Sequence, residues 1–234
     1  MKIIITGATR GIGNAVARRL APRATEMLIV AQDEERLQHC QQELVSAGVR
    51  RVETAAVDIS KPGAAQLVRR VAESREFHPD VLILNAGIFI EASLVDGPEE
   101  SFRRTLEANL TFDYAMAREF AGVLQLGDCP RIFLVGSTAG FEAYEYGPAY
   151  GIAKWGIRGL VVNLRHELRK VGIGVTHVVP GSTLTDLWAG EDLPENRLLE
   201  PDDIAKVIDA CLSLSEQAVV EEVIVRPILG DMHE

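Results

Sequence analysis

Short apolar runs recur along the chain, and stretches with the spacing of an amphipathic helix lie between them. Because the runs are apolar at consecutive positions, they are typical of strands in a parallel sheet that helices cover on both sides. The predicted strands are Lys2–Thr6, Met27–Ala31, Arg51–Val57, Val81–Leu84, Arg131–Gly136, Gly174–Val179 and Val220–Arg226. The predicted helices are Ile12–Ala21, Glu34–Ala47, Ala64–Ser74, Glu99–Gln125, Tyr150–Val171 and Asp202–Leu212.

This order of elements predicts an α/β fold with a doubly wound, seven-stranded parallel sheet, since strand-helix-strand units close with right-handed crossovers. No stretch has the composition of a linker, so residues 1–234 are expected to form one domain. One segment, about 186–201, shows no strand pattern. Loops of this length in compact folds are usually functional, and we expect this one to be a substrate lid.

Composition and charge narrow the possible partners. The chain has 24 basic and 34 acidic residues, and its net charge of −10 would repel a phosphate backbone, so no nucleic-acid partner is expected. The longest uncharged stretch, Val171–Thr185, is too short for a membrane span and is broken by glycine and proline. No secretory signal precedes the first predicted strand, which predicts a cytoplasmic protein without a membrane partner.

Cysteine and histidine spacing predicts no metal site. Cys40, Cys129 and Cys211 are far apart and odd in number, which fits free thiols better than disulfides or a zinc site. The five histidines also lack the spacing of metal ligands.

A glycine-rich turn, Thr6–Gly13, joins the first predicted strand to the first predicted helix. Glycine allows a tight turn there, close approach of the backbone to a pyrophosphate, and close packing of helix on strand. The start of the helix adds unpaired N–H groups and the positive end of its dipole. The turn therefore predicts a dinucleotide-binding site.

The choice between NADP(H) and NAD(H) depends on the end of the second predicted strand. Asp33 has the sequence distance of a residue that binds a ribose hydroxyl, but it also has the position of an N-cap for the next helix. Arg10 lies in the glycine turn, where a guanidinium would suit a 2′-phosphate, and Ala31 leaves no carboxylate to repel one. These residues favour NADP(H), with NAD(H) as the alternative.

Three further side chains form a candidate catalytic set. Tyr150 and Lys154 are four residues apart in a predicted helix and therefore share one face. A nearby ammonium favours the phenolate form of a tyrosine, which suits acid–base work. Ser137 follows a predicted strand and places a hydroxyl at the carboxyl edge of the sheet, where open α/β folds bind ligands.

Taken in order, these motifs resemble the short-chain dehydrogenase/reductase family over essentially the whole chain. The resemblance rests on Thr6-Gly7-x-x-x-Gly11-x-Gly13, Asp58, Asn85-Ala86-Gly87, Asn109, Ser137, Tyr150-x-x-x-Lys154 and Pro180-Gly181 with Thr185. It implies a Rossmann-type fold and an NAD(P)-dependent oxidoreductase that interconverts an alcohol and a ketone or aldehyde by hydride transfer.

The same resemblance implies roles for individual residues. Tyr150 would exchange the proton, Ser137 would hold the carbonyl oxygen, and Lys154 would assist Tyr150 and bind the nicotinamide ribose. Asn109 would anchor a proton-relay water. The implied cofactor contacts are Gly7, Thr9, Arg10, Gly11, Ile12, Gly13, Asp58, Ile59, Asn85, Ala86, Gly87, Tyr150, Lys154, Pro180, Gly181, Thr183 and Thr185.

Some positions depart from the family pattern. Leu84 and Gly136 stand where many members have a second Asn and a second Ser, and Gln32 stands where NADP-dependent members often have Arg. The tail, Glu221–Pro227, lacks the double glycine common in acyl-carrier reductases. A catalytically silent dinucleotide-binding or sensing protein is the alternative function, but it predicts loss of the Tyr or the Lys, and both are present.

Substrate choice and assembly are less directly encoded. The substrate, a small alcohol or carbonyl compound, would be selected by Glu91–Asp96, Phe141–Gly147 and the lid. The resemblance also implies a homodimer or homotetramer paired through the helices Glu99–Gln125 and Tyr150–Val171. The second of these carries the apolar residues Ile157, Leu160, Val161 and Leu164.

Overall fold

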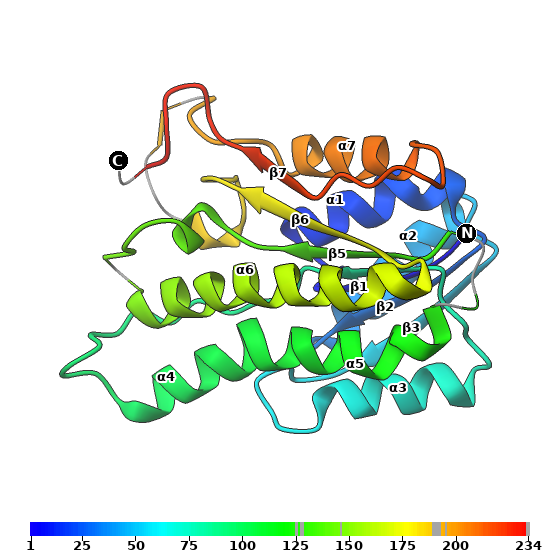
Figure 1. The fold of residues 1–234 in the computed structure, drawn as a ribbon, viewed down its shortest axis with the longest axis horizontal. Coiled ribbons are helices and arrows are strands. Elements are labelled where there is room, and N and C mark those ends of the chain that lie inside the picture. Colours follow the sequence, from blue (N-terminus) through cyan, green and yellow to red (C-terminus); the bar gives the residue numbers. More distant parts are fainter. Residues whose placement is uncertain (125, 127–128, 146, 189–192, 195, 233–234) are drawn as a thin grey trace.

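The computed structural model describes residues 1–124, 126, 129–145, 147–188, 193–194 and 196–232. Within them, seven parallel strands form one sheet in the order β3-β2-β1-β4-β5-β6-β7 (Figure 1). The strands are β1 (Lys2–Thr6), β2 (Glu26–Ala31), β3 (Arg51–Ala56), β4 (Val81–Leu84), β5 (Arg131–Val135), β6 (Gly174–Pro180) and β7 (Glu222–Val225). The predicted fold class, a doubly wound parallel sheet of the Rossmann type, is confirmed.

Helices cover both faces of the sheet (Figure 1). One face carries α1 (Gly11–Leu20), α2 (Glu34–Ser46) and α7 (Pro201–Leu212), and the other carries α3 (Ala64–Ser74), α5 (Phe112–Leu124) and α6 (Pro148–Leu168). A further helix, α4 (Glu99–Leu106), lies in line with α5 and packs against α6. None of the helices in the described part of the chain is long and apolar enough to cross a bilayer.

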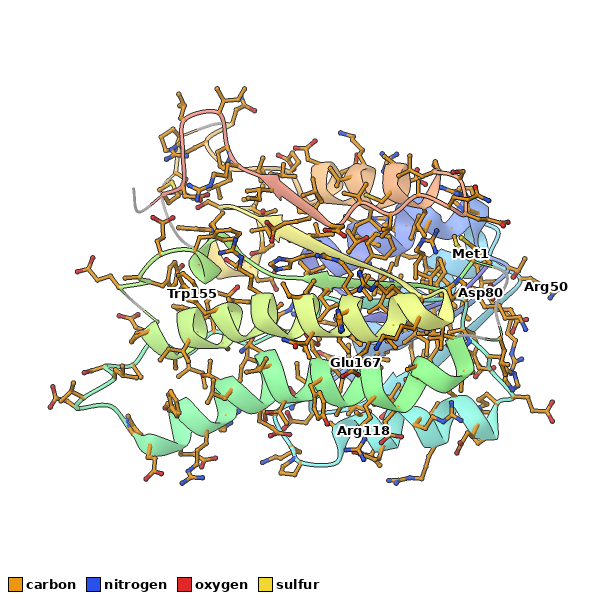
Figure 2. All side chains as sticks on the ribbon, viewed as in Figure 1. Met1, Arg50, Asp80, Arg118, Trp155 and Glu167 are labelled. Carbon is orange, nitrogen blue, oxygen red and sulfur yellow. The ribbon has the colours of Figure 1, made fainter. Side chains whose placement is uncertain are left out.

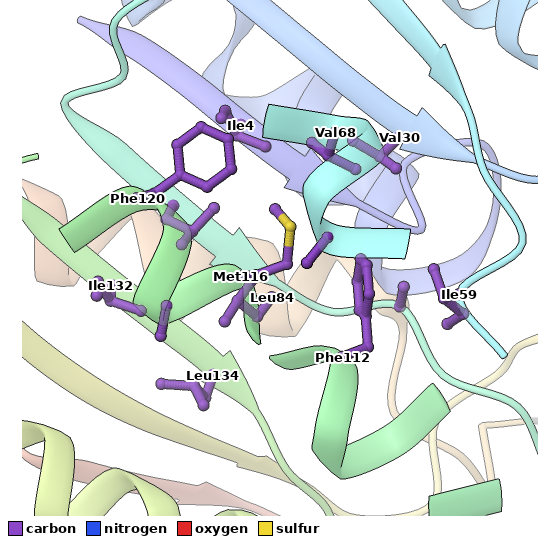
Figure 3. Close-up of a cluster of buried hydrophobic side chains, with 14 of the residues drawn as sticks. Ile4, Val30, Ile59, Val68, Leu84, Phe112, Met116, Phe120, Ile132 and Leu134 are labelled. Atoms are coloured by element: carbon purple, nitrogen blue, oxygen red, sulfur yellow. The ribbon is translucent and has the colours of Figure 1, made fainter. Parts of the chain in front are cut away.

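Alternate strand residues feed two hydrophobic cores, one on each face of the sheet. Ile4 contributes to the core under α3, α5 and α6, whereas its neighbours Ile3 and Ile5 contribute to the core under α1, α2 and α7. Figure 3 shows Phe112 and Phe120 in the first core. Both faces of each central strand are thus buried, which explains why these strands read as continuous apolar runs.

The boundaries of several elements differ from the predicted ones for identifiable reasons. The predicted helix Glu99–Gln125 is interrupted by a π-helical segment, Glu107–Thr111, between α4 and α5, and Gln125 lies outside the described residues. Helices α6 and α7 begin at Pro148 and Pro201, before the predicted starts, because proline suits the first helical position. Residues 189–192 and 195 of the predicted lid also lie outside the described residues, and the lid stays a prediction.

The face of α6 assigned to subunit pairing needs correction. Ile157 and Val161 are buried against the sheet, and Leu160 and Leu164 pack on the same core. These four follow a helical period, and that period marks the core side of the helix. Large exposed apolar side chains lie elsewhere on α6, at Ile152, Trp155 and Val162, and Trp155 is labelled in Figure 2. The homodimer or homotetramer itself stays a prediction.

A matched pair of substitutions tests this assignment of the core. Val161→Ala should lower the free energy of unfolding by about 1–3 kcal/mol, because it leaves a cavity beneath α6. Val45→Ala on α2 makes the same change at a side chain that is 51% exposed and should cost less than about 0.5 kcal/mol. Urea unfolding of both variants measures the difference; equal costs would contradict the burial of Val161.

Candidate active site

The carboxyl ends of the central strands open into one cavity of about 820 Å³. Of the residues predicted to bind cofactor or to act in catalysis, all but Gly13 line it: Gly7, Thr9, Arg10, Gly11, Ile12, Asp58, Ile59, Asn85, Ala86, Gly87, Asn109, Ser137, Tyr150, Lys154, Pro180, Gly181, Thr183 and Thr185. The strand order reverses between β1 and β4, and a crevice at such a point is the usual ligand site of an open α/β sheet.

The glycine turn is built by close backbone contacts. Gly7 and Gly11 have φ of +68° and +52°, a region that favours glycine. A Cβ at Gly13 would overlap with the carbonyl oxygen of Gly7, so Gly13 serves the packing of α1 on the turn. Asn85 Nδ2 donates to Thr6 O at 3.1 Å and thereby joins the ends of β1 and β4. The side chain of Asn85 is therefore used within the protein.

Four charged side chains gather at the end of the cavity beyond β2. Asp33 Oδ1 accepts a hydrogen bond from Arg36 N at 3.0 Å, so the structure shows it as the N-cap of α2. Arg10 Nη1 lies 2.8 Å from Asp186 Oδ2, and Arg36 Nη1 lies 3.7 Å from the same oxygen. No sequence motif marks Arg36 as part of the site or pairs it with Asp186, the first residue of the predicted lid, because the two lie 150 residues apart in the chain.

Asp58 follows β3 by two residues, and Ser60 fixes its side chain with two hydrogen bonds. Its Oδ1 accepts from the backbone N of Ser60 at 3.0 Å and from Ser60 Oγ at 2.7 Å. The hydroxyl of Ser60 lowers the pKa of the Asp58 carboxyl. Asp58 is therefore an ionised, oriented acceptor on the cavity wall.

Asn109 lies in the π-helical segment and anchors the turn after β4. Its Oδ1 accepts from Ile88 N at 3.2 Å, and its Nδ2 donates to Ile88 O at 2.8 Å and Thr105 O at 2.9 Å. A Cβ at Gly87 would lie 2.5 Å from Asn109 Oδ1. π-segments often occur at functional sites, and this one delivers a fully buried amide to the cavity floor.

Ser137, Tyr150 and Lys154 come together from β5 and α6. Lys154 is 5% exposed, its Nζ donates to Val135 O at 3.0 Å, and it lies 5.4 Å from the centre of the Tyr150 ring. Ser137 Oγ accepts from Ala139 N at 3.2 Å, which fixes the oxygen and leaves its proton for another acceptor. A hydroxyl donor, a phenol and an ammonium thus line the same cavity.

Two aromatic rings pack around Tyr150. Phe89 and Tyr144 lie 5.7 and 5.8 Å from its ring, and the Phe89 ring is nearly perpendicular to it. Burial raises the pKa of the Tyr144 hydroxyl, which therefore keeps its proton. Tyr144 belongs to the predicted substrate segment Phe141–Gly147, of which Tyr146 lies outside the described residues.

None of the residues of the other predicted substrate segment, Glu91–Asp96, lines the described cavity, and its part in substrate choice stays a prediction. Ile88 and Phe89, just before it, line the cavity instead, since Asn109 holds Ile88 against the end of β4. Trp188, from the predicted lid, also lines the cavity. Asp231 contributes from the C-terminal end, where its Oδ1 accepts from Ser182 N at 2.7 Å; no motif pointed to it.

Asp113 is a buried acid next to this constellation. It is 1% exposed, one helical turn beyond Asn109, and its Oδ1 has no hydrogen-bond partner among the described residues. Burial raises the pKa of the Asp113 carboxyl to about 7, and the Lys154 ammonium partly opposes this rise. In the sequence the signal is an Asp within the apolar face formed by Phe112, Met116 and Phe120.

The fold and the site define a dinucleotide-binding α/β oxidoreductase. Residues 1–196 match the family model described as short chain dehydrogenase. The chain therefore belongs to the short-chain dehydrogenase family, as its motifs predicted.

Named relatives and solved structures cover nearly the entire chain. Sepiapterin reductase of Chlorobaculum tepidum is 28% identical over 99% of this chain and 98% of its own. An alcohol dehydrogenase of Thermococcus sibiricus, complexed with 5-hydroxy-NADP, is 28% identical, covers 97% of this chain and 96% of its own, and has a TM-score of 0.87. A metagenomic short-chain oxidoreductase in complex with NADP is 31% identical at the same coverage, with a TM-score of 0.84.

Replacing Asp113 should make stability depend less on pH. Its carboxyl has a pKa of about 7 in the folded protein against 3.8 as the ordinary value, so the folded state binds the proton more tightly. Stability is therefore lost as pH rises from about 4 through 7, on the order of 4 kcal/mol in total. Asp113→Asn should be more stable than the wild type at pH 8 and gain much less at pH 4.5.

Urea unfolding at both pH values measures this effect. The exposed Asp96→Asn provides a control that removes the same charge and should change the unfolding free energy little at either pH. A gain for Asp113→Asn that is equal at pH 8 and pH 4.5 would contradict the raised pKa.

Proposed function

We propose that the protein is an NADP(H)-preferring oxidoreductase that interconverts a small alcohol and its ketone or aldehyde. One observation carries this proposal: Ser137, Tyr150 and Lys154 meet in the same cavity as the glycine turn of β1. A nicotinamide dinucleotide, when bound, supplies or accepts the hydride. The remaining tasks, orientation and proton transfer, fall to residues of this chain.

The cavity suits a dinucleotide on its own geometry. The turn at Gly7 and Gly11 brings backbone within reach of a pyrophosphate, and α1 begins directly at Gly11 with its free N–H groups. The residues proposed to hold the dinucleotide elsewhere are Asp58 and Ile59 at the adenine, Asn85–Gly87 along its middle, Lys154 at the ribose, and Pro180, Gly181, Thr183 and Thr185 at the carboxamide.

Ser137 and Tyr150 both act on the carbonyl oxygen of the substrate, Ser137 by a hydrogen bond and Tyr150 by proton transfer. Ser137 Oγ is fixed by Ala139 N and donates its own proton to the oxygen. Tyr150 gives its hydroxyl proton to the same oxygen in the reductive direction and takes it back in the oxidative direction. The Lys154 ammonium, 5.4 Å from the tyrosine ring, stabilises the negative charge that Tyr150 acquires.

The proposed role of Asn109 in the proton relay depends on main-chain groups of its π-helical segment and not on its side chain. Its amide side chain is occupied by Ile88 and Thr105, so a relay water would bind a main-chain group of the π-helical segment. That segment breaks the regular i to i−4 pattern, and it therefore changes which carbonyl groups are paired within the helix.

The aromatic wall bears on the substrate. Phe89 and Tyr144 place apolar ring surface beside the Tyr150 ring in the cavity, which favours carbonyl compounds with aryl or bulky alkyl substituents. A panel of aryl and alkyl ketones and aldehydes is therefore the appropriate assay set.

NADP(H) is favoured over NAD(H) by the charged group beyond β2. Arg10 and Arg36 both lie within 4 Å of the same Asp186 carboxylate oxygen, and a 2′-phosphate is an anion that the same two guanidinium groups would bind. Asp33 is engaged as a helix cap and is therefore less suited to a ribose hydroxyl. The 5-hydroxy-NADP in the Thermococcus enzyme and the NADP in the metagenomic enzyme support this preference.

Substitution of the tyrosine tests the mechanism. Tyr150→Phe keeps the ring contacts but removes the proton donor, so kcat should fall by about 10² to 10⁴ while dinucleotide affinity is kept. Lys154→Ala should weaken dinucleotide binding as well as turnover. Steady-state kinetics and fluorescence titration with dinucleotide measure the two quantities.

The matched control for this test is Tyr114→Phe, which removes a hydroxyl from a tyrosine that is 46% exposed on α5 and should leave kcat unchanged. If Tyr150→Phe keeps more than about a tenth of the wild-type kcat, Tyr150 is not the acid.

Cofactor preference can be tested at Arg10. The wild type should have a higher kcat/KM with NADPH than with NADH, and Arg10→Ala should lower the NADPH value by about 10- to 100-fold, since a charged hydrogen bond contributes roughly 1.5–3 kcal/mol. The NADH value should change little. Arg18→Ala, which removes an exposed arginine outside the cavity, is the control. Equal kcat/KM for the two dinucleotides in the wild type would contradict the preference.

A further inference from the structure

His177 lies directly behind the loop that carries Ser137. It is 2% exposed in β6, and the sheet register pairs it with Leu134 of β5, two residues before Gly136. A Cβ at Gly136 would overlap with His177 Nε2 and lie 3.1 Å from its Cδ2. The His177 ring therefore occupies the space that any side chain at position 136 would need.

The hydrogen bonds of His177 define which form of the ring fits. Its Nδ1 is 2.9 Å from Glu222 Oε2, and because a carboxylate only accepts, Nδ1 carries a proton. Nε2 is inaccessible and has no hydrogen-bond partner among the described residues. A second proton on Nε2 would create a buried N–H without an acceptor, pressed against Gly136. The site thus accommodates the neutral ring.

The charges around His177 favour the same form. Burial lowers the pKa of His177, and the ammonium of Lys154 and the guanidinium of Arg158 act in the same direction, whereas Glu222 opposes them. These are the charged groups that face the ring, Lys154 and Arg158 from α6 and Glu222 from β7. The Arg158 guanidinium is itself held 4.3 Å above the Phe141 ring, in the segment after Ser137.

We propose that His177 is a positioning residue of the active site: its neutral ring holds Gly136, and through it Ser137, and protonation of the ring displaces Ser137. The proposal rests on the role of Ser137 proposed above. Gly136 N donates to Val178 O at 2.7 Å, so the loop is held to β6 on one side by its backbone and on the other by the His177 ring. A reacting group displaced by about 1 Å can lose on the order of 10²-fold in rate.

The first test uses a variant that cannot titrate. In His177→Asn the side-chain amide can still donate to Glu222, but it carries no ionisable proton. The wild type should lose kcat as the pH falls from 7 to 5, and His177→Asn should lose at least threefold less over the same range. KM for the dinucleotide should follow the same pH dependence in both proteins, because the glycine turn follows β1, which β4 and β5 separate from the His177 strand β6.

The second test is a double-mutant cycle between positions 136 and 177. Gly136→Ala in the wild type forces a methyl group into the ring of His177, and kcat should fall by about 10². In the His177→Asn background the same change should cost at least tenfold less, because the atom that the methyl group would meet is gone. Gly122→Ala on α5, where a Cβ would meet nothing within 4 Å, is the control and should leave kcat unchanged.

Thermal unfolding of every variant accompanies the kinetics, since a purely structural role would lower the melting temperature without moving the pH profile. A Gly136→Ala cost that is the same in both backgrounds, or an acid limb that is unchanged in His177→Asn, would overturn the proposal. In either case an active wild type would leave the oxidoreductase function intact. A wild type that is inactive with every carbonyl and both dinucleotides would overturn both proposals.

Discussion

The Lys154 side chain carries a positive charge although the residue is only 5% exposed. The arrangement of the active site depends on how the protein stabilises this buried charge. Its hydrogen bond goes to a neutral acceptor, the carbonyl oxygen of Val135. A buried charge needs hydrogen bonds or an opposite charge, because leaving water costs several kcal/mol. The nearby carboxyl of Asp113 supplies only part of a countercharge at neutral pH, since burial raises its pKa to about 7. The field of the ammonium is therefore left to act on the cavity, where Tyr150 lies.

This arrangement requires α6 to lie unusually close to the elements around it. A Cβ at Gly140 would lie 2.8 Å from the carbonyl oxygen of Lys154, and a Cβ at Gly156 would lie 2.6 Å from Leu110 in the π-helical segment. The two glycines therefore let the helix backbone approach both the loop after β5 and the segment that carries Asn109. A side chain at Gly140 would meet the backbone of α6 and move the helix outward together with Lys154 and Tyr150, whereas a side chain at Gly156 would displace the Leu110 side chain.

The sequence predicted the fold and the residues of the cavity because both are written in local patterns. Continuous apolar runs mark strands buried on two faces, and the glycine turn, Ser137 and the Tyr150–Lys154 pair each stand at the end of a predicted element. The interruption of the helix around Asn109 was not predictable in this way. A π-segment of five residues is too short to change the spacing of apolar residues visibly from that of the flanking α-helices. The pairing face of α6 was misassigned because an apolar stripe does not say what covers it.

The partners of buried and charged groups could not be predicted either, since they come from other strands and loops. In the sequence Gly136 appears only as a departure from the serine that many family members have at this position. In the structure the ring of His177 from β6 excludes any side chain there. In the sequence Asp113 is only a polar residue on a predicted helix, and the folded structure is needed to show that it is buried and that its carboxyl interacts with Lys154. The two members of each pair are far apart in the chain and meet only after folding, so the sequence around either residue does not show the contact.

The number of hydrogen bonds also separates an ion pair that can exchange its partner from one that ties two helices together. The side chains of Arg10 and Asp186 are 60% and 51% exposed, and a pair this open to water contributes about 0–1 kcal/mol. Arg19, by contrast, binds both oxygens of Asp202 at 2.8 and 2.9 Å and ties α1 to α7. An anion entering the cavity can therefore take Arg10 from Asp186 at little cost, while the helices that flank the glycine turn stay in place. The charged group beyond β2 is thus arranged to change its partners without disturbing the scaffold that carries it.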